Sequence, residues 1–221
     1  EEGALVVISD VHERRLGEAV EALGAFTTTP PVGVLCDVTS EEDVARLIDT
    51  AIDAFGHIDV MGNNAGLGGT ASLLEMEDAQ WARVLDVTLN GTFRTTRAAL
   101  RHMLPRGKGV IVNNASVLGS RAQRGHAHYA AAKAGVMALT RCAAIEAAEV
   151  GVRVNAVAPS LATHPFLTKV MADGLLEELE AKEAFGRGAT PWEVANVIVF
   201  LASDYSSYMT GETVAVSSQH P

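Results

Sequence analysis

Short runs of β-branched and apolar residues alternate with longer stretches of helical periodicity along all 221 residues. The predicted strands are Ala4–Ser9, Val32–Leu35, Ile58–Met61, Gly109–Asn113, Arg153–Val157 and Thr213–Val216. Their apolar runs are continuous, which is typical of parallel strands covered by helices on both faces. The pattern therefore predicts one α/β domain over residues 1–221, a Rossmann-type doubly wound parallel sheet without linkers or repeats.

Helical patterns fill the intervals between these strands. The predicted helices are His12–Leu23, a segment beginning near Ser40, Asp78–His102, Ala127–Val150 and a segment beginning at Pro191. Ser40 suits a helix cap, and Pro191 suits a first helical turn. The longest irregular stretch runs from Pro159 to about Met171, and it is interpreted as a binding loop or, alternatively, as an ordinary connection.

Composition excludes several classes of function. The formal net charge of −10 argues against a nucleic-acid interface and against anchoring to an anionic membrane. No apolar run is long enough to span a bilayer. Cys36 and Cys142 make neither a disulfide framework nor a metal cluster, which is typical of a protein of the reducing cytoplasm.

A tyrosine and a lysine four residues apart carry the most specific chemical signal. On a helix, Tyr129 and Lys133 share a face, so the phenol and the ammonium can reach one site. An ordinary phenol has a pKa of about 10, and a nearby ammonium lowers it. Ser116 follows the strand Gly109–Asn113, at the carboxyl edge where doubly wound sheets bind ligands. Taken alone, the Tyr–Lys pair is better explained as a structural tyrosine on an amphipathic helix, because chance often produces this spacing.

The surrounding motifs resemble the short-chain dehydrogenase/reductase family. Ser116, followed thirteen residues later by Tyr-x-x-x-Lys, is similar to the active-site pattern of that family. Further similar segments are Asn63–Gly66, Cys36–Thr39, Arg153–Pro159, Phe200–Asp204 and Met209–Gly211. The resemblance implies that Tyr129 is the general acid/base and that Ser116 polarises the carbonyl. It also implies that Lys133 lowers the pKa of Tyr129 and binds the nicotinamide ribose.

The same resemblance implies a nicotinamide cofactor. Besides Tyr129 and Lys133, the expected cofactor contacts are Asp10, Asp37, Val38, Asn64, Ala65, Gly66 and Pro159. A carboxylate at Asp10 can bond both adenosine ribose hydroxyls and repel a 2′-phosphate, which favours NAD over NADP. The alternative for Asp10 is a cap for the helix His12–Leu23. Arginines at 14 and 15 weaken the argument, because arginine can accommodate that phosphate.

Four features depart from the family pattern. No glycine-rich phosphate-binding turn precedes the first strand, so we expect the natural protein to be longer at its N-terminus, with its first strand near the middle of the sheet. Thr88 stands at the position of a common catalytic asparagine, and its hydroxyl is the candidate to hold a relay water. Ser160 replaces the glycine of a Pro-Gly pair, and His164 replaces a threonine. Val216–His220 replaces an Asp-Gly-Gly ending.

These observations favour reversible hydride transfer between NAD(H) and a secondary alcohol or ketone. Val117, Leu118, Gln123 and the loop Ser160–Met171 are expected to bind the substrate. Several stretches are most similar to bacterial reductases of steroid-ring breakdown, which act on bicyclic ketones carried as coenzyme A thioesters. A 3-oxoacyl thioester reductase and a cofactor-binding protein without turnover are the alternatives.

The expected partners are a small-molecule substrate and further copies of the chain. Oligomers are common in the family, so a homodimer or homotetramer is expected, and a pure assembly protein has no positive support in the sequence. His126 and His128 lie just before the site residue Tyr129 in the sequence, but without a supporting carboxylate they predict no metal site.

Overall fold

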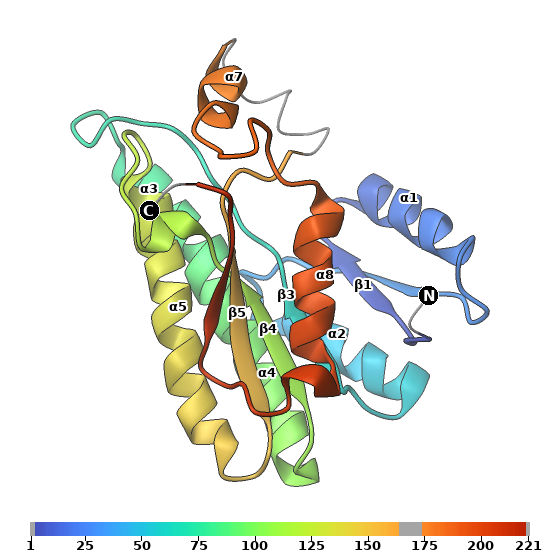
Figure 1. Cartoon of the computed structure of the whole chain (residues 1–221). Coiled ribbons are helices and arrows are strands. Elements are labelled where there is room, and N and C mark those ends of the chain that lie inside the picture. Colours follow the sequence, from blue (N-terminus) through green and yellow to red (C-terminus); the bar gives the residue numbers. More distant parts are fainter. Residues whose placement is uncertain (1–2, 164–173, 220–221) are drawn as a thin grey trace.

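The structure, a computed structural model, describes residues 3–163 and 174–219 (Figure 1). Its strands are β1 (Val7–Asp10), β2 (Val32–Leu35), β3 (Val60–Asn63), β4 (Val110–Asn114), β5 (Arg153–Pro159) and β6 (Thr213–Val216). Its helices are α1 (Glu13–Gly24), α2 (Glu41–Phe55), α3 (Asp78–Leu85), α4 (Gly91–Arg106), α5 (Ala127–Ala148), α7 (Leu175–Glu180) and α8 (Pro191–Ala202). Three shorter helical segments are η1 (Asp86–Asn90), η2 (Val117–Gly119) and η3 (Asp204–Ser206).

All strand pairs are parallel, which confirms the predicted α/β architecture. The strands form two groups, β1-β2 and β3-β4-β5-β6. Among the described residues, no strand pairs with β1 on its other side or joins it to β3, so the sheet is interrupted between β1 and β3. The sequence gives the bounds of β2 and β6 correctly, and those of the other strands are off by one to three residues.

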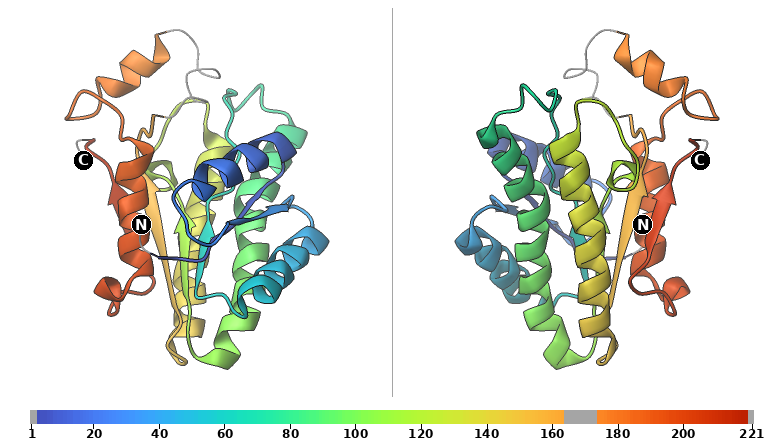
Figure 2. Two further views of the ribbon diagram at one scale, coloured as in Figure 1. Left: turned by 90° about the vertical axis from the view of Figure 1, so that its right-hand side faces the viewer. Right: turned by 90° about the vertical axis from the view of Figure 1, so that its left-hand side faces the viewer.

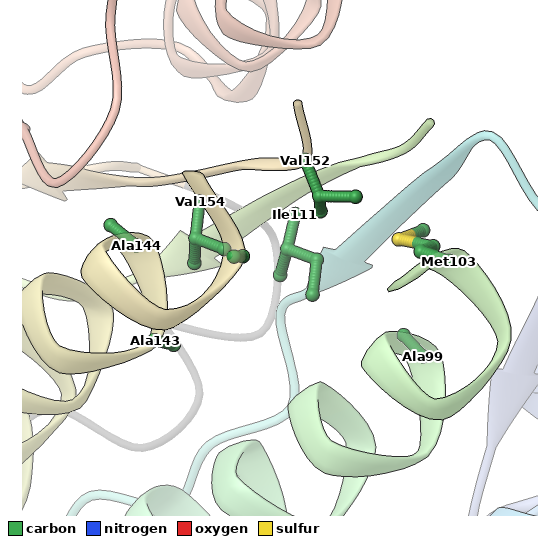
Figure 3. Packing of buried hydrophobic residues seen from close by; sticks show 8 residues of the cluster. Ala99, Met103, Ile111, Ala143, Ala144, Val152 and Val154 are labelled. Atoms are coloured by element: carbon green, nitrogen blue, oxygen red, sulfur yellow. The ribbon is translucent and has the colours of Figure 1, made fainter. Parts of the chain in front are cut away.

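Helices cover both faces of the larger sheet (Figure 2). α4 and α5 lie against one face, and α8 packs on β4 and β5 from the other. The core between α4, α5 and the strands is built from fully or almost fully buried side chains (Figure 3). It contains Ala99, Met103, Ile111, Ala143, Ala144, Ala147, Val152 and Val154. Across the described part of the chain, every helix is too short or too polar to cross a lipid bilayer.

Local sequence signals explain where α2 and α8 begin. The Ser40 side chain accepts a hydrogen bond from the Asp43 amide, 3.2 Å away, as the sequence predicts for a cap. Thr190 and Glu193 form a reciprocal capping box at the start of α8, with Pro191 in the first turn. α2 ends at Gly56, whose φ of 80° is the left-handed conformation that glycine adopts at low cost.

The predicted helix over residues 78–102 is divided into α3, η1 and α4. The middle segment, η1, is a π-helix. Two threonine hydroxyls donate to carbonyls of the preceding turn, Thr92 to Thr88 at 2.8 Å and Thr95 to Gly91 at 3.0 Å. Such side-chain bonds compete with the regular backbone ladder and bend helices, which a periodicity argument does not detect. π-Bulges are frequent at functional sites, and this one contains Thr88.

Candidate active site

The catalytic residues expected from the sequence come together at the carboxyl edge of the larger sheet. Ser116 lies two residues beyond β4, and α5 carries Tyr129 and Lys133. The segment after Ser116 packs directly on α5 at Gly119. A Cβ at this glycine would lie 2.9 Å from the carbonyl carbon of Lys133, closer than packed atoms tolerate. Gly119 therefore permits the approach that brings Ser116 to Tyr129.

The hydroxyls of Ser116 and Tyr129 interact in a largely buried environment. Burial raises the pKa of Tyr129 above its usual value, and a hydrogen bond from Ser116 partly opposes that rise. Ser116 Oγ also accepts from the Leu118 amide at 3.2 Å and lies 3.5 Å from the carbonyl oxygen of Pro159. Both hydroxyls can therefore point to one substrate oxygen.

Lys133 is almost fully buried beneath Tyr129. Its side chain is 3% exposed, and its ammonium donates to the carbonyl oxygen of Asn114. Burial lowers the pKa of Lys133 to about 8. The ammonium faces the Tyr129 ring at 5.6 Å from its centroid. The expected lowering of the Tyr129 pKa by Lys133 is therefore not seen in this structure, where burial of the phenol dominates.

Asn114 joins the site although sequence reasoning did not single it out. Its Nδ2 donates to Asn64 Oδ1 at 2.7 Å, and its carbonyl oxygen holds Lys133. Asn114 Oδ1 is buried and has no partner among the described residues. Its position in the sequence, between Asn113 and Ser116, is a signal by which it could have been identified as a site residue.

These groups fit the ribose of a nicotinamide nucleotide. A Cβ at Gly66 would lie 3.5 Å from Lys133 Nζ, at ordinary contact distance, so glycine leaves space beside the ammonium that a side chain would fill. Asn64, Ala65 and Gly66 are exposed in the loop after β3. The site thus offers an ammonium donor and the unpartnered Asn114 acceptor, which suit hydroxyl groups.

Asp37 and Val38 occupy a turn after β2 that rests on α4. Asp37 Oδ1 accepts from both the amide and the hydroxyl of Thr39, at 2.9 and 2.8 Å, so the carboxylate shapes the turn. Val38 packs against Gly91, where a Cβ would lie only 2.6 Å from a valine methyl. An open hollow of about 840 Å³ lies beside the turn and is lined by Asp37, Thr39 and residues of α3 and η1.

Asp10 ends β1 and holds the start of α1. Its Oδ1 accepts from the His12 amide and from the Arg15 guanidinium, both at 2.7 Å. Burial alone would raise the pKa of Asp10, but these two hydrogen bonds outweigh it and lower the pKa. Asp10 thus holds His12, the N-cap residue of α1, but does not itself cap the helix, and Arg15 is engaged with the carboxylate.

Thr88 uses its hydroxyl to hold the loop after Gly66. The hydroxyl donates to the Leu67 carbonyl at 3.1 Å and accepts from the Leu67 amide at 2.9 Å. Thr88 is fully buried. Its hydroxyl proton is therefore used in the bond to Leu67 and is not available to hold the expected relay water. The sequence did not reveal that Thr88 braces this loop.

The expected substrate-binding residues are described only in part. Val117 is buried in η2, while Leu118, Gln123 and Ser160 are partly exposed near the site. The rest of the loop up to Met171, including His164, lies outside the described residues. Within residues 3–163 and 174–219, no three His, Cys, Asp or Glu side chains gather to share a metal ion.

Pro159 ends β5 at the same edge, with its carbonyl oxygen facing Ser116. Among the expected cofactor residues, Gly66 and Tyr129 adjoin the Lys133 ammonium, Asn64 is joined to them through Asn114, and Pro159 faces Ser116. Asp10, Asp37 and Val38 belong to the two turns that follow β1 and β2. The expected contacts thus fall into two groups along the sheet edge, as the two halves of a dinucleotide would require.

Comparisons with known proteins agree with this geometry. Residues 1–218 match the short-chain dehydrogenase family model described as Enoyl-(Acyl carrier protein) reductase. The (5R,7aS)-5-hydroxy-7a-methyl-1-oxo-2,3,5,6,7,7a-hexahydro-1H-indene-carboxyl-CoA reductase of Mycobacterium tuberculosis is 62% identical over 100% of this chain and 84% of its own. A cis-4-hydroxycyclohexanecarboxylate dehydrogenase of Sinomonas cyclohexanicum is 43% identical over 98% and 86%. A 3-oxoacyl-[acyl-carrier-protein] reductase of Thermotoga maritima is 36% identical over 98% and 87%.

Solved structures share the fold over the whole chain. A short chain dehydrogenase from Mycobacterium smegmatis superposes with a TM-score of 0.86 at 56% identity, covering 100% of this chain and 83% of that one. An NAD⁺-bound xylitol dehydrogenase superposes with a TM-score of 0.92 at 29% identity, covering 98% and 89%. The chain therefore belongs to the short-chain dehydrogenase/reductase family and is an oxidoreductase that acts on CH–OH groups.

Proposed function

We propose that the protein reversibly reduces a ring ketone of a steroid-derived bicyclic coenzyme A thioester with NADH. The convergence of Ser116, Tyr129 and Lys133 in one buried site is the observation that supports carbonyl reduction as the reaction type. The 62% identity to the indene-carboxyl-CoA reductase supports the substrate class. Reduction of a 3-oxoacyl thioester is the alternative, supported by the more distant reductase from Thermotoga maritima.

The catalytic side chains act on the substrate oxygen. Tyr129 donates its proton to the carbonyl oxygen, and burial, by keeping the phenol protonated, suits it to act as the acid. Ser116 turns its hydroxyl from Pro159 to the same oxygen and stabilises the negative charge that develops there. Lys133, held by the Asn114 carbonyl, places a positive charge beside the Tyr129 ring, where it would stabilise the phenolate left by the transfer, although burial still holds the pKa of the phenol above its usual value.

The proposed cofactor is NAD(H), which supplies the hydride when bound. Lys133, Asn64 and Gly66 would hold its nicotinamide ribose, with Asn114 as a further acceptor. The turns at Asp10 and at Asp37–Val38, with Pro159 at the end of β5, complete the set of expected contacts. The pairing of Arg15 with Asp10 supports NAD over NADP, because this arginine is not free to receive a 2′-phosphate.

We also propose a cytoplasmic homo-oligomer. Phe93 of α4 is 42% exposed and Ile145 of α5 is 76% exposed, so neighbouring helices present apolar side chains to solvent. Cys36 and Cys142 are both free thiols, as in proteins of a reducing compartment. Light scattering is expected to give a mass of two or four chains, and a monomer at micromolar concentration would contradict the proposal.

NADH oxidation across a ketone panel tests the function. The panel contains a hydroindanone-type ketone as its coenzyme A thioester, a monocyclic ketone and a 3-oxoacyl thioester, each repeated with NADPH. We expect the highest kcat/KM with the bicyclic thioester and NADH, and Ser116→Ala should lower that value strongly. Preference for the 3-oxoacyl thioester would select the alternative, and turnover of none of them with intact NADH binding would refute the proposal.

A further inference from the structure

Glu183 is a buried carboxylate that the proposed reaction does not use. It follows α7, and only 4% of its surface is exposed. Among the described residues no lysine or arginine forms an ion pair with it. A buried charge of this kind is costly unless hydrogen bonds replace its water. The structure supplies these bonds from two segments that are distant in the sequence.

The first segment begins the loop that follows β5. Glu183 Oε1 accepts from the Leu161 amide at 3.3 Å. Leu161 is two residues beyond Pro159, whose carbonyl oxygen lies beside the Ser116 hydroxyl. The carboxylate thus fixes the start of one wall of the active site.

The second segment is Ser217–Gln219, which we name the C-terminal strap. Glu183 Oε2 accepts from the Ser218 hydroxyl at 2.9 Å and from its amide at 3.3 Å. The backbone strengthens the link, because the Ala184 amide donates to the Ser218 carbonyl at 2.8 Å. Glu183 and Gln219 also form an antiparallel bridge. Burial alone would raise the pKa of Glu183, but hydrogen bonds, led by that of Ser218, outweigh it and lower the pKa.

The strap continues to the opposite wall of the site. Arg121 donates to Gln219 Oε1 at 2.8 Å, and Arg121 lies two residues beyond η2, which directly follows Ser116. The strap directly follows β6, which pairs in parallel with β5 up to Pro159, so it lies at the catalytic edge of the sheet. One carboxylate, Glu183, therefore connects the strap and the loop after β5, and through Gln219 it reaches the segment after Ser116.

We propose that Glu183 is a positioning residue that sets the spacing of the two walls around Ser116 through the C-terminal strap. This inference rests on the proposed function, because its consequence is substrate selection. A large bicyclic ketone contacts both walls, whereas a small cyclic ketone needs only the hydroxyls of Ser116 and Tyr129. Loosening the connection therefore weakens binding of the large substrate and leaves the chemical step with the small one intact.

Two variants of the full-length protein break the connection at different points. Glu183→Gln keeps the size of the side chain but removes the charge and one acceptor, and Gln219→Ala cuts the bond to Arg121. Glu177→Gln, at an exposed glutamate of α7, is the matched control. We expect the KM for the bicyclic thioester to rise about tenfold in both variants, as for loss of one charge-assisted hydrogen bond. The kcat/KM for cyclohexanone and the dissociation constant for NADH should stay within twofold of the parent.

Amide hydrogen exchange gives a readout that does not depend on turnover. In Glu183→Gln, residues 117–121 should exchange faster, although the carboxylate does not touch them, and Glu177→Gln should leave them unchanged. Unchanged exchange at 117–121, or a KM that rises equally for both ketones, would overturn the positioning role and leave Glu183 as a structural brace. If the parent reduces neither ketone, the proposed function fails, and the exchange result alone decides whether Glu183 connects the walls. If Glu183→Gln does not fold, Gln219→Ala decides by the same measurements.

Discussion

Burial of Lys133 should make the stability of the protein depend on pH in a defined way. Its pKa is about 8 in the folded protein, below the ordinary 10.5, because burial disfavours the charged ammonium. The folded state therefore releases this proton before the unfolded state does, and stability rises with pH between the two values. At pH 7 the burial of the charged ammonium lowers the free energy of unfolding by about 3 kcal/mol, since one unit of pKa corresponds to about 1.4 kcal/mol.

Lys133→Met removes this penalty and its pH dependence together. The variant also loses the bond to the Asn114 carbonyl, so its stability at a single pH is ambiguous. The change with pH of the difference in stability between the variant and the parent is well defined. Between pH 7 and pH 9.5, the free energy of unfolding of the parent should rise by about 2 kcal/mol relative to that of the variant.

Urea denaturation at five or six pH values in that range measures this difference. Lys182→Met is the matched control, because Lys182 is exposed in an ion pair with Glu178 and should show no such change. A difference between Lys133→Met and the parent that stays constant from pH 7 to 9.5 would refute the reasoning. It would mean that the ammonium is solvated or already paired in the folded protein.

Three further substitutions test other contacts of the site. Gly91→Ala should lower the free energy of unfolding by about 1–2 kcal/mol, because the new methyl meets Val38 at 2.6 Å. Adding Val38→Ala should recover most of this loss. Purely additive effects of the two substitutions would argue against the contact. Thr88→Val should cost about 1–3 kcal/mol in urea unfolding, because Leu67 loses the hydroxyl that pairs its amide and its carbonyl, and an unchanged midpoint would show that water replaces it. Asp10→Asn should raise the NADPH/NADH ratio of kcat/KM roughly tenfold by removing charge repulsion, whereas an unchanged ratio would leave Asp10 only the role of holding α1.

The sequence predicts those parts of the fold that rest on local patterns. The strands appear as apolar runs, the start of α2 appears as the capping residue Ser40, and the start of α8 appears as the first-turn proline Pro191. The division of the predicted helix over residues 78–102 could not be read in this way. Its π-helical segment is accompanied by local hydroxyl-to-carbonyl bonds, such as that of Thr92 to Thr88, and by the tertiary contact of Thr88 with Leu67, and helical periodicity reveals neither.

The candidate site shows the same difference between residues marked by local patterns and residues that depend on distant partners. The spacing from Ser116 to Tyr129 and Lys133 is local, and the structure places these side chains together. Asn114 and Glu183 act through partners distant in the chain, so local spacing does not predict their contacts, although the position of Asn114 next to Asn113 and near Ser116 was one available signal. The expected effect of Lys133 on the Tyr129 pKa was inferred from helical spacing, which brings side chains together but does not fix their burial.

NADH-dependent ketone reduction by the parent protein and by Tyr129→Phe tests the central claim most directly. Phenylalanine preserves the ring that packs beside Gly68 and over Lys133, and it removes only the proton that we assign to the carbonyl oxygen. We expect kcat/KM for the best ketone of the panel to fall by at least about a hundredfold, with NADH binding within a few-fold of the parent. A Tyr129→Phe protein that retains the turnover of the parent would contradict the account, because the proton would then come from another group.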